Sequence, residues 1–151
     1  MRGATLKPIS VRIDCPRFVV EFEYESALTR VDRVVSSGTS VRPPRHALIL
    51  QCRVRGDGVL IHAPFLISRS GFRRFLAALD GLDSGSTRIA RLQGVEARAS
   101  TLQIERGVLE LPLLSLSVSV VAMRGYFGFD QIPISDQSLD KIGAWVRCCI
   151  G

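Results

Sequence analysis

Apolar and polar residues alternate through the first part of the chain, which is the pattern of β-strands with one buried face. In "RFVVEFEYE" (residues 17–25), the apolar series Phe18, Val20, Phe22 and Tyr24 alternates with Val19, Glu21, Glu23 and Glu25. A period of two places these series on opposite faces of a sheet. We therefore predict a strand with three glutamates on its solvent face, preceded by a shorter strand in "KPISVRID" (residues 7–14).

The segment "HALILQCRVRGDGVLIHAPFLIS" (residues 46–68) predicts a β-hairpin. Its Gly56-Asp57-Gly58 centre tolerates the positive φ angles that tight hairpin turns require. Pro64 has no backbone N–H, so its strand is expected at a sheet edge or at a bulge. The preceding "SSGTSVRPPR" (residues 36–45) predicts a loop, because its Ser, Gly and Pro content cannot continue a helix or a central strand.

Two segments change to helical spacing. In "SRSGFRRFLAALDGL", the apolar residues Phe72, Phe75, Leu76, Leu79 and Leu82 recur every three or four positions, which predicts a helix over about residues 69–82. Ser68 or Ser70 can cap its start and Gly81 its end. A second helix is predicted over about 136–149, with Ser135 as its cap and an apolar stripe of Leu139, Ile142, Val146 and Cys149.

Further strands are predicted between the two helices, near residues 87–92, 97–105, 108–121 and 124–129. The last of them is expected to end in an exit turn at Asp130-Gln131. Strands, helix, strands and helix in this order predict an α+β fold, a mostly antiparallel β-sheet covered by two helices. The length of 151 residues fits a single domain over residues 1–151.

The chain is basic, and its charge is unevenly placed. The formal net charge is +6, and residues 1–75 hold 13 Lys and Arg against 6 Asp and Glu. Such a balance indicates an acidic partner. The start of the sequence has no signal-peptide pattern, and no apolar run reaches the roughly 20 residues of a membrane span. We therefore expect a soluble cytoplasmic protein.

No catalytic or metal-binding pattern is present. Asp130 and Asp136 could in principle act as paired carboxylates, but no histidine accompanies them. His46 and His62 belong to no HxH or HExxH pattern. The four cysteines have no ligand spacing and are expected as reduced thiols that fill the core. The sequence predicts a protein that is not an enzyme and has no cofactor or metal.

Two groups of charged residues are candidates for binding. One is the acidic row Glu21, Glu23 and Glu25, which could mimic phosphates for a basic partner or could be a solvated face that discourages edge pairing. The other is a set of arginines around the proline-containing loop, which could contact phosphates or be a solvated basic surface. This set contains Arg30, Arg33, Arg42, Arg45, Arg53 and Arg55.

The chain resembles the WapI-type bacterial immunity proteins and their small relatives over roughly residues 46–150. The resemblance rests on the hairpin that leads into "GFRRFLAALDGL", on the strands "STRIARLQ" to "LSLSVSVVAM", and on "YFGFDQIPISDQSLDKI". It implies a cytoplasmic bacterial protein that neutralises a cognate toxin by binding it, without catalysis. We expect such a protein partner to contact Glu21, Glu23, Glu25, Arg42 and Arg45.

Two alternatives remain. The chain could be a nucleic-acid-binding accessory protein that uses its arginine-rich N-terminal half, and its binding would then weaken steeply with salt. It could also be an enzyme or a small-molecule binder with a pocket between sheet and helices, although the sequence reveals no convergent polar groups for one.

Overall fold

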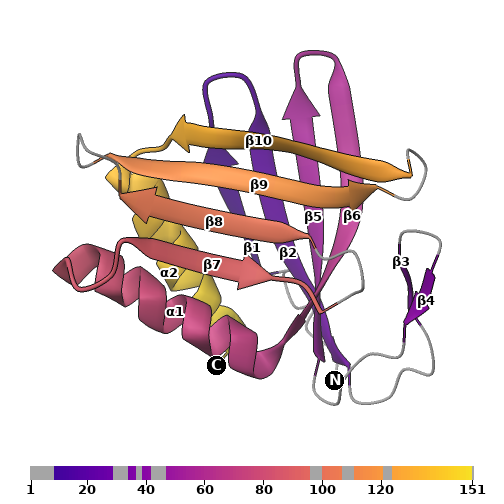
Figure 1. Ribbon diagram of the computed structural model, residues 1–151, viewed down its shortest axis with the longest axis horizontal. Coiled ribbons are helices and arrows are strands. Elements are labelled where there is room, and N and C mark those ends of the chain that lie inside the picture. Colours follow the sequence, from indigo (N-terminus) through magenta and orange to yellow (C-terminus); the bar gives the residue numbers. More distant parts are fainter. Residues whose placement is uncertain are drawn as a thin grey trace, which may run out of the picture.

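Two four-stranded antiparallel sheets cross each other, and the hydrophobic core lies between them and two helices (Figure 1). The computed structural model describes residues 9–28, 34–36, 39–41, 47–95, 100–106, 111–120 and 124–150, with the backbone alone at 25–28, 34–36, 39–41 and 47. The first sheet has the strand order β1-β2-β5-β6 and the second has the order β10-β9-β8-β7.

The first sheet contains β1 (Ile9–Asp14), β2 (Val19–Leu28), β5 (Ala47–Gly56) and β6 (Val59–Ser68). The second contains β7 (Ile89–Gln93), β8 (Thr101–Arg106), β9 (Pro112–Val120) and β10 (Gly125–Pro133). The helices are α1 (Arg69–Ser84) and α2 (Asp136–Ile150). The predicted α+β class, antiparallel pairing and two helices are confirmed. The strands divide into two sheets because each sheet has one apolar face, and two such faces can bury each other.

The β5–β6 hairpin forms as its sequence predicts. Asp57 and Gly58 form the turn with φ angles of 48° and 75°, as the favoured two-residue hairpin turn requires. Pro64 lies in β6, which is an edge strand, so its missing N–H interrupts no pairing with a further strand.

Helix α1 begins as predicted but ends later. Ser68 caps its start, since the Gly71 N–H donates to the Ser68 hydroxyl at 3.0 Å. Its end lies at Gly85, which has a φ of 81°, and not at Gly81. Gly81 is buried inside the helix, where an added Cβ would lie 2.5 Å from the Thr87 hydroxyl oxygen. Gly81 therefore serves close packing instead of ending the helix.

Two loop predictions need correction. The loop predicted over residues 36–45 contains the short strand β4 (Thr39–Val41), which pairs with β3 (Val34–Ser36) as a separate hairpin. The exit turn predicted at Asp130-Gln131 is a bulge within β10, which continues to Pro133. The Ser115 hydroxyl holds this bulge, because it donates to Asp130 at 2.9 Å and accepts from the Gln131 N–H at 2.9 Å.

Helix α2 is joined to the core through Trp145. The Trp145 ring lies 5.8 Å from that of Phe22 in β2 and 5.6 Å from that of Phe72 in α1. Ser135 caps this helix as predicted, accepting a hydrogen bond from the Ser138 N–H at 3.0 Å. Helix α2 thus packs on α1 and on the first sheet, while α1 packs on β7 of the second sheet.

Candidate functional site

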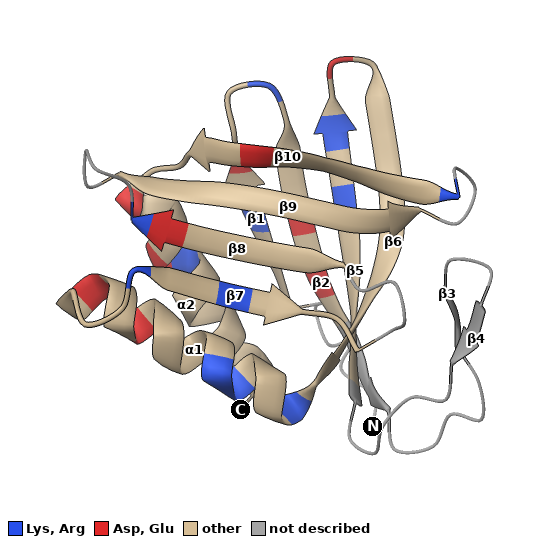
Figure 2. Ribbon diagram, viewed as in Figure 1, with Lys and Arg blue, Asp and Glu red and all other residues tan. Residues whose placement is uncertain are grey.

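The predicted acidic row lies beside arginines of the neighbouring strand. Figure 2 shows acidic positions on β2 next to basic positions on β5. Arg53 approaches Glu23 at 3.2 Å, and Arg55 approaches Glu21 at 3.8 Å. These pairs balance charge on the outer face of the first sheet. The glutamates on β2 and the arginines on β5 each recur at every second residue. This spacing in the sequence was a signal that the two sets could lie on the same face of two paired strands.

The other predicted binding residues are not placed by the structure. Arg42 and Arg45, with Arg30 and Arg33, lie outside the described residues, as does the side chain of Glu25. The contact set predicted for a protein partner therefore stays a prediction.

The structure does not bring the two candidate carboxylates together. Asp130 accepts a hydrogen bond from Ser115, whereas Asp136 at the start of α2 accepts one from Arg106 at 3.2 Å. His62 lies exposed on β6. Across the described ranges, no group of three His, Cys, Asp or Glu side chains gathers as a set of metal ligands.

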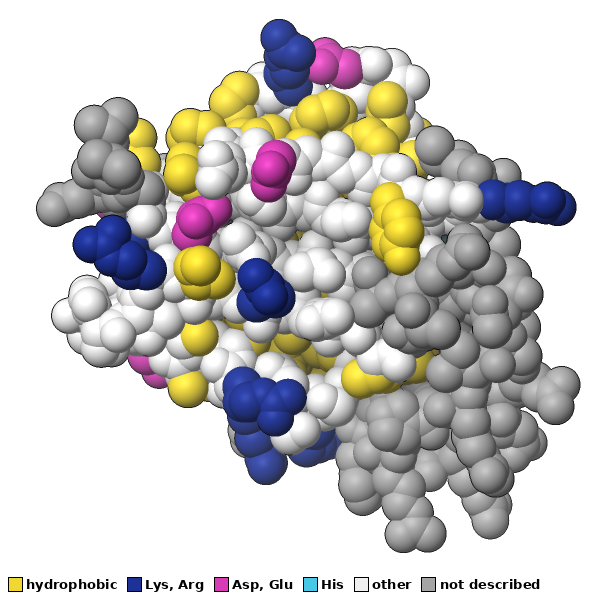
Figure 3. Space-filling model, in the orientation of Figure 1, with side chains coloured by type: hydrophobic (Ala, Val, Ile, Leu, Met, Phe, Trp, Pro, Cys, Tyr) yellow, Lys and Arg dark blue, Asp and Glu magenta, His cyan; other side chains and the backbone are white. Residues whose placement is uncertain are grey.

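The outer face of the second sheet is hollowed. A depression of about 410 Å³ lies over β8, β9 and β10. Cross-strand pairing places Thr101 and Gly128 on either side of Ser117, and Gln103 beside Ser115. The lining residues are Thr101, Gln103, Ser115, Leu116, Ser117, Gly128, Phe129 and Asp130. Figure 3 shows this part of the surface largely as backbone and uncharged polar atoms.

Small side chains make the hollow. The serines that alternate through β9 project on this face, while Leu114, Leu116 and Val118 are buried beneath it. Gly128 has no side chain, and an added Cβ there would lie 2.3 Å from the Leu116 carbonyl oxygen. Serines alternate with apolar residues along β9, which gives this strand one polar face, but the hollow arises only from the register in which the successive strands β8, β9 and β10 pair.

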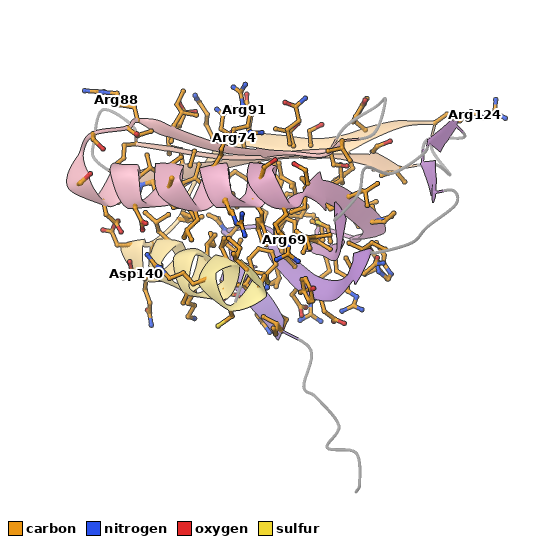
Figure 4. All side chains as sticks on the ribbon, turned by 90° about the horizontal axis from the view of Figure 1, so that it is seen from below. Arg69, Arg74, Arg88, Arg91, Arg124 and Asp140 are labelled. Carbon is orange, nitrogen blue, oxygen red and sulfur yellow. The ribbon has the colours of Figure 1, made fainter. Side chains whose placement is uncertain are left out.

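Three arginines lie on the same face of the molecule as the depression, although none of them lines it. Arg88, Arg91 and Arg124 project on the side of the molecule formed by the outer face of the second sheet (Figure 4). Arg91 holds a fixed position, since it donates two hydrogen bonds to the Gln103 side-chain oxygen at 2.9 and 2.7 Å. In the part of the chain that the structure describes, no ion pair joins these three arginines to a carboxylate.

An aromatic ring and two carboxylates complete this face. Tyr126 of β10 is 48% exposed, so its ring is open to a ligand. Asp130 is held by Ser115, and Glu105 accepts a hydrogen bond from the Gln131 side chain at 3.1 Å. We call Arg91, Gln103, Ser117, Tyr126 and Gly128, with the lining of the depression, the outer-sheet site. Of these residues, the sequence singled out only Asp130, and as a candidate catalytic carboxylate instead of a binding residue.

Burial suppresses the ionisation of three of the four thiols. Desolvation raises the pKa of buried Cys52 to about 12. Desolvation, followed by the charge of Asp14, raises the pKa of Cys15 to about 11. Desolvation, followed by the neighbouring Cys148, raises the pKa of Cys149 to about 12. All four cysteines are free, and Cys148 is exposed, so that residue does not fill the core as expected.

Thiol labelling is expected to be selective. With a disulfide reagent at about pH 8, Cys148 should react first, because its side chain is the exposed one of the four. The other thiols should react slowly, because their raised pKa values keep them protonated, and labelling of Cys15 should accelerate as pH rises toward 11. Cys148→Ser should remove the fast phase, which absorbance of the released reagent would measure. A fast phase that persists in this variant would contradict the assignment.

Neither helix, within the residues described, is long and apolar enough to cross a membrane.

Comparison with known proteins identifies the fold. No protein-family model matches the sequence, and no curated protein matches it significantly. Among solved structures, the chain is similar to WHY1 from Arabidopsis thaliana, with a TM-score of 0.60 and 10% identity over 97% of this chain and 91% of that chain. It is also similar to the plant transcriptional regulator PBF-2, with a TM-score of 0.58 and 10% identity over 99% of this chain and 82% of that chain.

These similarities overturn the main functional prediction. The predicted role as an immunity protein that neutralises a toxin is wrong, because the fold is shared along almost the whole chain with a transcriptional regulator. A toxin-like partner has no support from either neighbour. The WapI-type resemblance itself is not tested by either comparison and stays a prediction. At 10% identity, what the chain shares with WHY1 and PBF-2 is the fold.

Proposed function

We propose that this chain is a non-enzymatic protein that binds single-stranded nucleic acid across the outer-sheet site. The observation that carries the proposal is the hollow of small polar side chains on an open sheet face, with Arg91 held beside its lining residue Gln103 and the exposed ring of Tyr126 on the edge strand β10. A single strand can place its bases against such a face, because its bases are not already paired with a second strand.

Each part of the outer-sheet site suits a different part of a single-stranded nucleic acid. Tyr126 offers a flat ring on which a base can stack, which is the sequence-tolerant contact of single-strand binding. Gly128 and Ser117 leave room for a base to approach the sheet backbone. Arg91 can contact phosphate with the donors that it does not use for Gln103. Together these contacts provide stacking, close approach and charge.

The carboxylates of Glu105 and Asp130 determine how the nucleic acid lies on the sheet. Glu105 and Asp130 lie on this face and repel phosphates, so the backbone of the strand is expected on the side of the arginines. Carboxylates accept hydrogen bonds and cannot donate them, so they suit the amino groups of bases. We therefore expect bases over the depression and phosphates along Arg88 and Arg91.

The fold supports this proposal, since PBF-2 is a transcriptional regulator with the same architecture. The sequence predicted that nucleic acid would bind the arginine-rich N-terminal half, whereas the proposal places nucleic-acid binding on the outer face of the second sheet. Arg53 and Arg55 of that half approach Glu23 and Glu21. By contrast, Arg91 on β7, and Arg88 and Arg124 directly before β7 and β10, form no ion pair with a described carboxylate. The single-domain organisation and the cytoplasmic location belong to the same proposal.

Strand binding should depend on Tyr126 and Arg91. We expect fluorescence anisotropy with a labelled DNA strand of about 20 nucleotides to show binding that weakens as salt rises from about 50 to 200 mM. Tyr126→Ala with Arg91→Ala should weaken that binding about tenfold, because one stacked base and one phosphate contact are removed.

Two controls make this test specific. Tyr126→Phe should keep the affinity, because the ring remains, and Arg73→Ala should keep it because Arg73 lies exposed on α1. Equal binding by the double variant and the native chain would overturn the proposed surface. A preference for duplex over single strand would overturn the proposed ligand.

A further inference from the structure

A second depression lies at the end of the first sheet, beside the turn between β1 and β2. Its volume is about 490 Å³, and Arg12, Arg17, Arg55, Cys15, Pro16 and Phe18 contribute to its lining. The three arginines come from β1, from the turn, and from β5. Figure 2 shows basic positions on the β1–β2 turn and on β5.

The turn that shapes this depression is held in place. The Cys15 N–H donates to the Phe18 carbonyl at 2.8 Å and closes the turn. The Phe18 ring stacks on Phe129 of the second sheet at 5.7 Å and meets Phe127 edge-on at 5.8 Å. Gly56 lies so close that an added Cβ would be 2.1 Å from the Arg17 carbonyl oxygen. The arginines therefore project from fixed backbone.

The charge in this depression is incompletely balanced. No carboxylate lines it. Asp14 engages only the Nε of Arg12 at 3.1 Å, and Glu21 lies 3.8 Å from Arg55, which is too far for a hydrogen bond. Arg17 forms no ion pair with a carboxylate of the described residues. Each guanidinium carries five N–H donors, so most of these donors remain available to an anion.

We propose that this depression binds a phosphate ester, with the phosphate between the arginines and the organic part against Pro16 and Phe18. The planar guanidinium fork matches phosphate oxygens and forms strong charge-assisted hydrogen bonds with them. The apolar surface of Pro16 and Phe18 suits a sugar or a base and not a bare ion. The ester can be a free mononucleotide or the terminal phosphate of a strand, which share this chemistry.

Cys15 does not take part as a nucleophile. Desolvation and the neighbouring Asp14 raise the pKa of its thiol to about 11, so the thiol is protonated near neutral pH. The depression is therefore a binding site without covalent chemistry. It is distinct from the depression of the outer-sheet site, since the two share no lining residue, although Phe18 of one stacks on Phe129 of the other.

Titration with adenosine monophosphate, followed by amide chemical shifts, tests this proposal on the full chain. We expect shifts at Cys15, Arg17 and Gly56, and an affinity at least tenfold weaker in the variant with Arg17→Ala and Arg55→Ala. Both side chains are exposed, so the double variant should fold, which circular dichroism would verify. Arg73→Ala is the matched control and should bind as the native chain does. If the native chain does not bind adenosine monophosphate, or if the double variant binds it equally well, a free mononucleotide is not the ligand.

A parallel titration separates the two sources of phosphate. If a strand supplies the ester, a 5′-phosphorylated short strand should bind more tightly than its unphosphorylated form, and the double variant should erase that difference. If neither that difference nor adenosine monophosphate binding is seen, the proposal fails as a whole. The shifts at Cys15, Arg17 and Gly56 report on this depression, whereas the Tyr126 and Arg91 variants report on the outer-sheet site, so failure here is distinguishable from failure of nucleic-acid binding on the second sheet.

Discussion

Replacing Trp145 by alanine is expected to lower the free energy of unfolding by about 3–5 kcal/mol, because a large buried side chain leaves a cavity. Trp145 is 4% exposed and packs against Phe22 and Phe72, which belong to different elements. Its indole N–H also donates to the Ile9 carbonyl at 3.2 Å. One side chain thus joins α2 to α1, to β1 and to β2.

Chemical denaturation followed by circular dichroism would measure this loss. Tryptophan fluorescence cannot follow the unfolding of these variants, because the substitution removes the one tryptophan in the sequence. The midpoint of thermal unfolding should fall by roughly 10 °C for a protein of this size. Trp145→Phe is the control and should cost about 1–2 kcal/mol, because it retains an aromatic ring but loses the hydrogen bond. A loss below about 1 kcal/mol for the alanine variant would show that the core does not depend on this residue.

Gly128→Ala is expected to destabilise the protein by about 3 kcal/mol, because the new Cβ has no room. That Cβ would lie 2.3 Å from the Leu116 carbonyl oxygen and 3.1 Å from the Ser117 Cα, both of which are backbone atoms of β9. A flexible side chain could move away from the new Cβ, but the backbone of β9 can move only by disturbing its pairing with β10. The substitution should therefore separate β10 from β9 and also deform the outer-sheet site.

Gly143→Ala provides a matched control for the same chemical change. Gly143 lies within α2, and its added Cβ would meet only the end of the Arg147 side chain, at 3.5 Å. Alanine is favoured over glycine in a helix interior, so this variant should gain about 0.5–1 kcal/mol. Urea unfolding of both variants would compare them. Equal stabilities would contradict the close approach of β10 and β9 at Gly128.

Local sequence patterns predicted most of the elements. The alternation through Phe22 and the helical spacing through Phe72 depend only on which residues neighbour each other in the chain. The Asp57-Gly58 turn, the Ser68 cap and the Ser135 cap follow from the same local chemistry. These features were confirmed because a strand, a turn or a helix start is specified by a few adjacent residues.

Local patterns failed where a contact from outside the element decides the conformation. Gly81 resembles a helix end, yet Thr87 packs against it and the helix continues to Ser84. Asp130-Gln131 resembles an exit turn, yet the Ser115 hydroxyl holds it as a bulge inside β10. In both cases, a contact from another segment overrides the local preference.

The sequence by itself thus determined the α+β class, the strand and helix order and the basic charge of this protein. The tertiary structure decided that the strands form two crossed sheets and that Glu21 and Glu23 face Arg55 and Arg53. It also decided which polar face is hollow, through the register of the successive strands β8, β9 and β10. It decided which arginines converge as well, because Arg12 and Arg17 meet Arg55 from a segment far away in the chain. Pairing across such distances depends on the packing of the whole core, and no local pattern of residues specifies it.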